Sequence, residues 1–493
     1  MAVTELDPEV CYRALRTRDA RFDGRFFVGV TTTRIYCRPV CPAGPAKPQN
    51  CRFFPSAAAA QSAGFRPCLR CRPETAPELG PWRGTASTVS RGLQLIAEGA
   101  LDGEDASVAA LAERLGVGER QLRRSFEQHL GASPIAVAQT RRVLFGKQLI
   151  RETVLPLSEI AHLAGFGSVR RFNETFQKLF GRPPSALRRE PRASAEPPCG
   201  VSVHLYHTQP YDWASLIGHL RARAIDGVER VADDRYERTV LQAGETGTVV
   251  VRPVPERGAL LATVHFPNLR ALPQIIARVR RVFDVSADVA TINAHLASDP
   301  LLGPAVARRP GLRLPGGWDG FELAVRAVLG QQITVSAARG LLGRLVRLCG
   351  VPLDGASGDA LRLAFPEPAR VLAAPLEQLP VPGARRRTLA ALAHAALEDE
   401  ALFQRRESLE QTVTRLRAIP GVGEWTAQYI ALRAAGEPDA FPASDRGLLR
   451  GATSPGGPEP RAADLLRRAE PWRPWRAYAA QHLWAVDAGR RAS

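Results

Sequence analysis

The cysteines of this chain are concentrated near one end. Six of the eight lie within the first 71 residues, and four of them form two close pairs. Cys37 and Cys41 make the first pair, and Cys68 and Cys71 make the second after 26 intervening residues. Each pair can approach one ion from a tight turn, and four thiolates suit tetrahedral zinc. Disulfides or four unrelated thiols are the alternatives. The spacing favours one zinc ion in a small separate domain.

Length and composition limit the remaining possibilities. The chain has 493 residues, about three times a typical domain, which predicts two to four domains. A hydrophobic fraction of 45% excludes a mostly disordered protein. No apolar run approaches the roughly 20 residues of a membrane helix. The first ten residues carry Glu5, Asp7 and Glu9 where a secretory signal carries positive charge. We therefore expect a cytoplasmic, nucleoid-associated protein without a membrane partner.

The charge balance indicates a polyanionic partner. The formal net charge is +17, and each of the three regions of the chain that are described below has more basic than acidic residues. Lysine and arginine release counterions when they meet phosphates, so nucleic acid is the leading partner. The alternative is that charge reflects coding bias, because 63 of the 66 basic residues are arginine and the lysines are Lys47, Lys147 and Lys178.

Two proline-containing polar stretches, residues 73–84 and 188–200, separate three regions. Strand-like runs open the last region, at 201–207, 246–251 and 260–265, and amphipathic helices follow. The predicted domains are a zinc domain at 1–80, a helix-turn-helix region at 85–190, an α+β subdomain at 201–310 and an α-helical domain at 311–490.

The cysteine region matches a known family. The segments TTRIYCRPVC, ending at Cys41, and AGFRPCLRC, ending at Cys71, closely resemble the N-terminal domain of the Ada adaptive-response proteins. The resemblance implies that all four cysteines bind zinc and that Cys37 also accepts a methyl group, irreversibly, from methylphosphotriesters in DNA. Zinc would hold the sulfur as a thiolate, and Arg38 would add positive charge for the phosphate. Methylation removes the thiolate charge and weakens repulsion from DNA, which gives a switch.

A helix-turn-helix pattern occurs twice in the second region. Ser107 can cap a first helix, Gly116 supplies the turn, and residues 119–130 form a second helix with several arginines. The pattern recurs around Gly165, which follows Gly116 by 49 residues, and leads into residues 168–180. Ordinary helix packing also produces helix-glycine-helix sequences. The repeat with basic second helices favours two tandem units.

The segment NETFQKLFGRPPS, which begins at Asn173, strongly resembles the signature of AraC-type regulators. In such proteins two recognition helices enter successive major grooves. The resulting candidates for base or phosphate contact are Arg120, Gln121, Arg123 and Arg124 in the first unit and Ser168, Arg170, Arg171 and Asn173 in the second.

The segment LRAIPGVGEWTA, residues 416–427, has the form of a helix-hairpin-helix. Its glycines let backbone N–H groups approach a phosphate, with a helix N-terminus behind them. The predicted backbone contacts are Pro420, Gly421, Val422 and Gly423. On its own, such a hairpin indicates only nonspecific binding to DNA. Asp445 lies 22 residues after Gly423 and just before another helix, where capping is the ordinary role of an aspartate.

Residues 201–488 look like an AlkA-type alkyladenine DNA glycosylase. The matching motifs are PYDW from Pro210, RPGLRLPG from Arg309, AVLGQQ from Ala327 and WRPWRAY from Trp472. The resemblance implies that Asp445 is the catalytic aspartate. The aromatics that match the base pocket are Trp425, Tyr429 and Trp484. Gln332 stands where a leucine wedge enters the duplex in the best-known member, and a glutamine can still fill the gap left by an extruded base.

The implied activity is that of DNA-3-methyladenine glycosylase II, which hydrolyses the N-glycosidic bond of alkylated purines. These purines carry positive charge, so the bond is already weak and the ring stacks on electron-rich aromatic faces. Asp445 would stabilise the oxocarbenium-like sugar and orient or deprotonate water, with no cofactor. Strand-cutting glycosylases use an amine, usually lysine, and no lysine follows Lys178. We therefore expect a monofunctional enzyme.

The sequence predicts a multidomain protein: a small α+β zinc domain, an all-α tandem helix-turn-helix, and an α+β subdomain followed by a helical glycosylase. The expected partners are double-stranded DNA with alkylated bases and methylphosphotriesters, promoter DNA and, for the regulator, RNA polymerase. The alternative is a transcription regulator whose glycosylase-like region only binds DNA. The retained Asp445 and aromatic set argue against that alternative.

Overall fold

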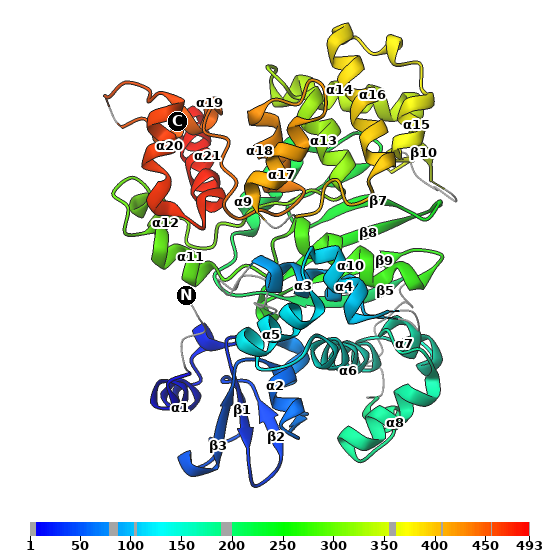
Figure 1. Ribbon diagram of the computed structural model, residues 1–493, viewed down its shortest axis with the longest axis vertical. Helices are drawn as coiled ribbons and strands as arrows, with labels where there is room; N and C mark the ends of the chain where they lie inside the picture. Colours follow the sequence, from blue (N-terminus) through cyan, green and yellow to red (C-terminus); the bar gives the residue numbers. More distant parts are fainter. Residues whose placement is uncertain are drawn as a thin grey trace. The chain divides into compact units, whose positions relative to one another are not determined.

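The structure, a computed structural model, contains two compact units of the chain (Figure 1). It describes residues 6–77, 87–102, 106–188, 200–353, 361–405, 408–454 and 456–492. Unit 1 comprises Met1–Thr208, Val254–Ala277 and Val285–Ala287. Unit 2 comprises Gln209–Pro253, Arg278–Asp284 and Asp288–Ser493. The cysteine region and the helix-turn-helix region thus belong to the same unit.

The cysteine region is a small α+β fold at the start of unit 1. Its sheet has the strand order β3-β1-β2-β4, with β2 and β4 parallel and the other pairs antiparallel. The strands are β1 (Phe27–Val30), β2 (Ile35–Cys37), β3 (Cys51–Phe54) and β4 (Arg66–Pro67), and the helices are α1 (Pro8–Thr17) and α2 (Ala57–Ser62). Large aromatic side chains, including the buried Tyr36 and Phe65, pack between the sheet and α2. These side chains form a small core for the cysteine region.

Six α-helices lie among the described residues of the second part of unit 1. They are α3 (Ser87–Ala97), α4 (Val108–Leu115), α5 (Glu119–Leu130), α6 (Pro134–Glu152), α7 (Leu157–Leu163) and α8 (Val169–Phe180). The predicted first cap is confirmed, because the Ser107 side chain accepts from the N–H of Ala110. Gly116 ends α4 in the left-handed conformation, at φ 71°, where a β-carbon would be strained. The two predicted helix-turn-helix units therefore correspond to α4 with α5 and to α7 with α8.

Helix α6 packs against the cysteine region within unit 1. The Lys147 ammonium is fully buried, 2.7 Å from the carboxylate of Glu74 and 3.2 Å from the carbonyl oxygen of Cys68. Nearby, the carboxylate of Glu152 accepts from Arg72 at 3.0 Å and from the backbone N–H of His204 at 3.2 Å. A buried ammonium needs such partners because an uncompensated charge is costly away from water. Charged contacts therefore bind α6 to the turn that carries Cys68.

The α+β start of the third region is also confirmed. In unit 1, β5 (Val201–Tyr206) pairs antiparallel with β9 (Ala259–His265). In unit 2, β6 (Glu229–Val231), β7 (Tyr236–Gln242) and β8 (Glu245–Val254) form antiparallel neighbours. The sequence analysis predicted β5, β8 and β9 but missed β6 and β7, whose alternation is interrupted by charged residues such as the buried Arg238. That arginine is neutralised by Glu322 at 2.8 Å.

Helices dominate the rest of unit 2 (Figure 1). They are α9 (Trp213–Arg223), α11 (Val289–Leu296), α12 (Gly303–Arg308), α13 (Gly320–Leu329), α14 (Val335–Cys349), α15 (Pro368–Ala373), α16 (Gly383–Glu398), α17 (Leu409–Arg417), α18 (Glu424–Arg433), α19 (Arg446–Ala452), α20 (Ala462–Arg468) and α21 (Arg476–Ala492). Helix α10 (Leu272–Val282) crosses a unit boundary, and β10 (Val351–Pro352) pairs with β11 (Leu363–Ala364). Helix α13 has most of its side chains buried and packs on α16 and α18. Over the described ranges, no helix is long and apolar enough to cross a membrane.

Candidate functional site

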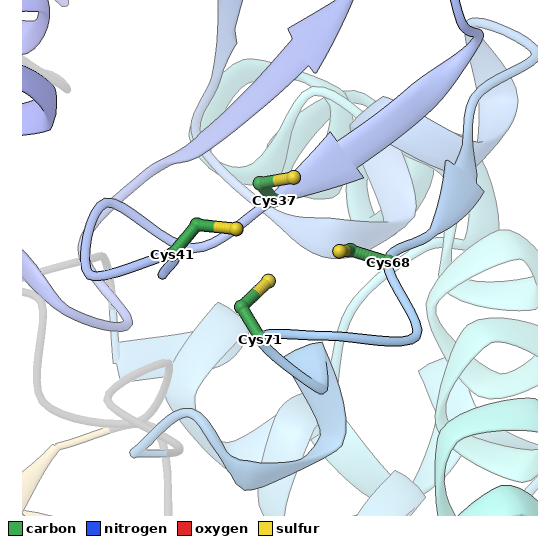
Figure 2. Close-up of side chains that lie close together, drawn as sticks. All are labelled: Cys37, Cys41, Cys68 and Cys71. Carbon is green, nitrogen blue, oxygen red and sulfur yellow. The ribbon is translucent and has the colours of Figure 1, made fainter. Parts of the chain in front are cut away.

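The four predicted zinc ligands converge at one point of the cysteine region (Figure 2). Their sulfur atoms all lie within 4.8 Å of one another. Cys37 ends β2 and Cys68 follows β4, so the parallel pairing of these strands brings the two thiols together, and tight turns supply Cys41 and Cys71. Four sulfurs at about 2.3 Å from one zinc would be separated by roughly 3.8 Å. The cluster therefore fits a tetrahedral zinc ion.

The cysteines differ in exposure. Cys37 is partly exposed, whereas Cys41, Cys68 and Cys71 are buried. Hydrogen bonding among the thiols raises the pKa of Cys37 and lowers that of Cys68, because Cys37 donates a proton to its neighbours. The same donation lowers the pKa of Cys41 to about 7. Because Cys37 is the most exposed of the four thiols, a reagent from solvent meets it first.

The expectation that Arg38 offers its charge to a phosphate needs correction. Its side chain is largely buried, with Nε 2.8 Å from the carboxylate of Asp23, so its charge is already paired. It also donates to the carbonyl oxygen of Cys71 at 3.2 Å, and its backbone N–H points at the Cys71 sulfur at 3.3 Å. Arg38 therefore holds the turn at Cys71 in place.

The predicted recognition helices are α5 and α8. Arg120, Gln121 and Arg124 are exposed on α5, and Arg171 and Asn173 are exposed on α8. Arg123 forms an ion pair with Glu119 at 2.6 Å, and Arg170 pairs with Glu174 at 2.8 Å. Ser168 caps α8 by accepting from the N–H of Arg171. Exposed pairs of this kind contribute little to stability, so DNA phosphates can replace the acidic partners.

The predicted hairpin connects α17 and α18 as expected. Gly421 has φ 86°, and a β-carbon there would clash with the Thr388 hydroxyl, so this position requires glycine. Val422 is buried, whereas Pro420 and Gly423 are exposed. The hairpin therefore presents its backbone at the start of α18, where N–H groups are free of helical partners.

Asp445 caps α19 and also binds two of the predicted pocket aromatics. Its Oδ1 accepts from the backbone N–H groups of Gly447 at 2.9 Å and Leu448 at 3.1 Å. The indole N–H of Trp484 donates to Oδ1 at 2.8 Å, and that of Trp425 donates to Oδ2 at 2.9 Å. Donors thus fix both oxygens of the carboxylate. The capping and functional interpretations of this residue are compatible.

The three predicted pocket aromatics gather around this carboxylate. Trp425 and Tyr429 stack, with ring centroids 5.3 Å apart and planes 12° apart. Tyr429 meets Trp484 edge to face at 6.4 Å. All three side chains are partly exposed, so their rings are available to a ligand. The sequence analysis missed Arg433, whose guanidinium lies over Tyr429 and Trp484.

Gln332 lies on the loop between α13 and α14. It is exposed and has φ 58°, in the left-handed region. The preceding Gln331 anchors this loop to the hairpin, since its amide lies 3.3 Å from the carbonyl oxygen of Gly421 and 3.0 Å from the Thr426 hydroxyl. The next residue, Ile333, is a 38% exposed apolar side chain that the sequence analysis did not single out. The available signal in the sequence was an apolar residue directly after the two glutamines of the AVLGQQ motif.

Family models match three successive segments of the chain. They are the metal binding domain of Ada at residues 10–74, a helix-turn-helix domain at 111–190 and the AlkA N-terminal domain at 202–319. A curated relative from Mycobacterium tuberculosis, named a probable bifunctional transcriptional activator/DNA repair enzyme AlkA, is 41% identical over 484 residues. The match covers 97% of this chain and 96% of the relative. This chain belongs to that bifunctional family.

Other relatives match parts of this bifunctional family member. The DNA-3-methyladenine glycosylase 2 of Escherichia coli is 37% identical over 281 residues, which are 56% of this chain and 95% of that protein. The solved 3-methyladenine DNA-glycosylase from Archaeoglobus fulgidus has a TM-score of 0.51 and 19% identity, covering 58% of this chain and 98% of that one. The latter likeness concerns the fold alone. Together with the family match, these findings confirm a glycosylase fused to an Ada-like regulator.

Proposed function

We propose that unit 2 excises alkylated purines such as 3-methyladenine from double-stranded DNA, with Asp445 as the catalytic carboxylate. The observation that carries this proposal is the carboxylate held by the indoles of Trp425 and Trp484, beside the stacked rings of Trp425 and Tyr429. A flipped cationic purine stacks favourably on such rings. The hairpin residues Gly421 and Gly423 grip the backbone beside it. The relative from Escherichia coli, a DNA-3-methyladenine glycosylase, points to the same lesion.

Hydrolysis then follows from the charges. The bond between C1′ and the base nitrogen breaks, and its electron pair neutralises the purine. The sugar takes up the positive charge, which the Asp445 carboxylate stabilises. Water adds to C1′ and loses a proton, for which the same carboxylate is the acceptor. The products are a free base and an abasic site.

We assign the wedge to the loop that carries Gln332, with Ile333 beside it. An extruded base leaves a gap that an exposed side chain can fill. The hydrogen bonds of Gln331 hold this loop close to the hairpin that we propose binds the DNA backbone. Because no lysine follows Lys178, unit 2 has no lysine amine for a Schiff base, and we propose a monofunctional glycosylase without a cofactor.

For the cysteine region we propose one zinc ion bound by Cys37, Cys41, Cys68 and Cys71, with Cys37 as methyl acceptor. When bound, zinc would keep the sulfurs deprotonated. The Cys37 sulfur attacks the methyl carbon of a methylphosphotriester, the carbon–oxygen bond breaks, and its electron pair stays on the phosphate oxygen as a diester. The partial exposure of Cys37, against three buried partners, supports this choice.

For α5 and α8 we propose insertion into successive major grooves of promoter DNA. The contact residues would be Arg120, Gln121, Arg123 and Arg124 on the first helix and Ser168, Arg170, Arg171 and Asn173 at the second.

We propose that the functional domains span residues 1–80, 85–190, 201–310 and 311–490. We also propose a nucleoid location, because the substrate is chromosomal DNA. The proposed protein partner of the activator is RNA polymerase.

The test is base release by the purified full-length chain. Duplex DNA treated with a methylating agent is incubated with the protein, and the supernatant is analysed for free 3-methyladenine by chromatography. We expect free base together with alkali-sensitive abasic sites, and no strand breaks before alkali. Absence of free base at enzyme excess, with DNA binding intact, would favour the alternative of a regulator whose glycosylase-like region only binds DNA.

A further inference from the structure

Arg433 places a buried charge against the base pocket. It ends α18, and only 3% of its surface is exposed. The carbon at the centre of its guanidinium lies 5.1 Å from the Trp484 ring centroid and 5.7 Å from that of Tyr429. Its two terminal nitrogens donate to the carbonyl oxygen of Pro315 at 2.6 Å and to the side-chain oxygen of Gln481 at 3.0 Å. The pocket rings therefore have a cation in contact with them.

The charge of this guanidinium is not cancelled locally. Within the described part of the chain, no carboxylate forms an ion pair with Arg433, whose terminal nitrogens bind neutral oxygens and whose Nε has no hydrogen-bond partner. Burial raises the pKa of the Tyr429 hydroxyl, but the charges of Arg433 and Arg223 together lower it below its usual value. Buried cations are usually paired with acids, because leaving water is costly. Neutral partners leave this arginine with a field that extends into the pocket.

Arg433 and Asp445 meet the same ring. Trp484 donates its N–H to the carboxylate and has the guanidinium over its ring. A base held by Trp425, Tyr429 and Trp484 thus experiences a fixed positive charge from Arg433 and a fixed negative charge from Asp445. Trp484 thus contacts both charged groups, and in the described part of the chain no ion pair joins Arg433 to Asp445.

We propose that Arg433 is a positioning residue whose uncompensated charge, acting through Tyr429 and Trp484, favours the transfer of positive charge from the bound base to the sugar. This inference rests on the proposed glycosylase function. As the bond from C1′ breaks, its electrons move to the base, which becomes less positive while the sugar becomes more positive. A cation behind the base disfavours the substrate more than the transition state, and such differential binding increases the rate.

The experiment separates rate from affinity. Arg433→Gln removes the charge and keeps an amide donor, Arg433→Lys keeps the charge, and Gln481→Glu neutralises Arg433 in place. Gln481→Leu is the control that loses the hydrogen bond but retains the charge. Single-turnover release is measured on a duplex with one 7-methylguanine. Affinity is measured in an Asp445→Asn background, in which the lesion stays intact.

We expect Arg433→Gln and Gln481→Glu to slow release about tenfold while lesion DNA binds equally or more tightly, because unit charges interact strongly at short range in a poorly solvated pocket. Arg433→Lys and Gln481→Leu should retain most of the rate. Equal losses of rate and affinity, or unchanged rates in both neutralised variants, would overturn the proposal. If Arg433→Gln does not fold, Gln481→Glu against Gln481→Leu decides it. Failure of the wild-type chain to release base would instead refute the glycosylase function.

Discussion

Trp484 donates its indole N–H to Oδ1 of Asp445 across 2.8 Å, and that oxygen also caps helix α19. The cap fixes the carboxylate relative to the helix, and the indole fixes it relative to the pocket. A capping carboxylate is common at helix starts, but one that also binds two indoles is specific to this pocket. Local structure and proposed catalysis therefore depend on the same side chain.

Substituting Asp445 with Asn should abolish most base release. The amide can still accept the capping hydrogen bonds but lacks the negative charge that stabilises the sugar cation. A loss of about 100-fold or more in the single-turnover rate is expected for one electrostatic group that acts on the developing charge. DNA affinity, measured by fluorescence anisotropy on undamaged duplex, should change little.

The matched control is Asp319→Asn. Asp319 caps α13 with the same geometry, accepting from Phe321 N–H at 2.9 Å and Glu322 N–H at 3.1 Å, but it contacts no pocket aromatic among the described residues. This control should retain base release while showing any general cost of replacing a capping aspartate. Near-normal release by Asp445→Asn, or equal losses in both variants, would contradict the assignment.

The sequence predicted the elements that depend on local patterns. Ser107 and Gly116 bound α4 as expected, because a capping hydroxyl and a left-handed glycine act on their immediate neighbours. The zinc cluster could be predicted equally well, because the short spacing within each of the two cysteine pairs identifies the four ligands. For Asp445 and the aromatics of unit 2 the resemblance was needed, because these residues are separated by up to 59 positions.

Long-range packing of charges could not be predicted in the same way. Sequence periodicity treats Lys147 and Arg433 as ordinary exposed cations, yet both are buried. Lys147 is paired with Glu74, 73 residues away, and Arg433 has neutral partners at Pro315 and Gln481. Arg38 was misinterpreted for the same reason, since its partner Asp23 lies on another segment. Burial of a charge is decided by tertiary contacts, which no local pattern records.

Removal of one cysteine should release the metal. The purified chain is expected to contain one zinc per molecule, and Cys41→Ala should lose it and unfold the cysteine region, because so small a core depends on its metal. Elemental analysis gives the zinc content, and limited proteolysis followed by mass spectrometry reports cleavage within residues 1–80. Cys349→Ala, at a buried cysteine of unit 2, is the control and should retain zinc. Protein purified without chelators yet free of zinc would refute the assignment.

Methylation should reach Cys37 and strengthen DNA binding by unit 1. Neutralising one thiolate reduces repulsion from phosphates, and a coupling of roughly 1–3 kcal/mol corresponds to 5- to 150-fold tighter binding. Peptide mass spectrometry after incubation with methylated DNA locates the methyl group, and titration on the chain's own promoter compares the two forms. A methyl group on Cys68 or Cys71 would contradict the choice of acceptor. Equal affinities of the two forms would contradict the switch.

Two buried groups in unit 2 should give opposite pH dependences of stability. Burial, with a smaller contribution from Arg309, lowers the pKa of His482 from 6.5 to about 4, so the unfolded chain binds more protons between these values. His482 therefore makes unfolding easier as the pH falls from 6.5 to 4. Burial raises the pKa of Asp284 from 3.8 to about 6, so the folded chain binds more protons there. Asp284 therefore makes unfolding easier as the pH rises from 4 to 6.

Each effect amounts to about 3 kcal/mol over its window, at about 1.4 kcal/mol per pKa unit, so the two largely offset each other in the wild type. Single variants should separate them. Asp284→Asn leaves the histidine contribution, and its unfolding free energy should rise with pH from 4 to 6 relative to the wild type. His482→Gln should show the reverse slope. Denaturant unfolding followed by tryptophan fluorescence is suited to this comparison, because six of the seven tryptophans belong to unit 2. Parallel pH profiles for both variants and the wild type would show that neither group titrates as its burial requires.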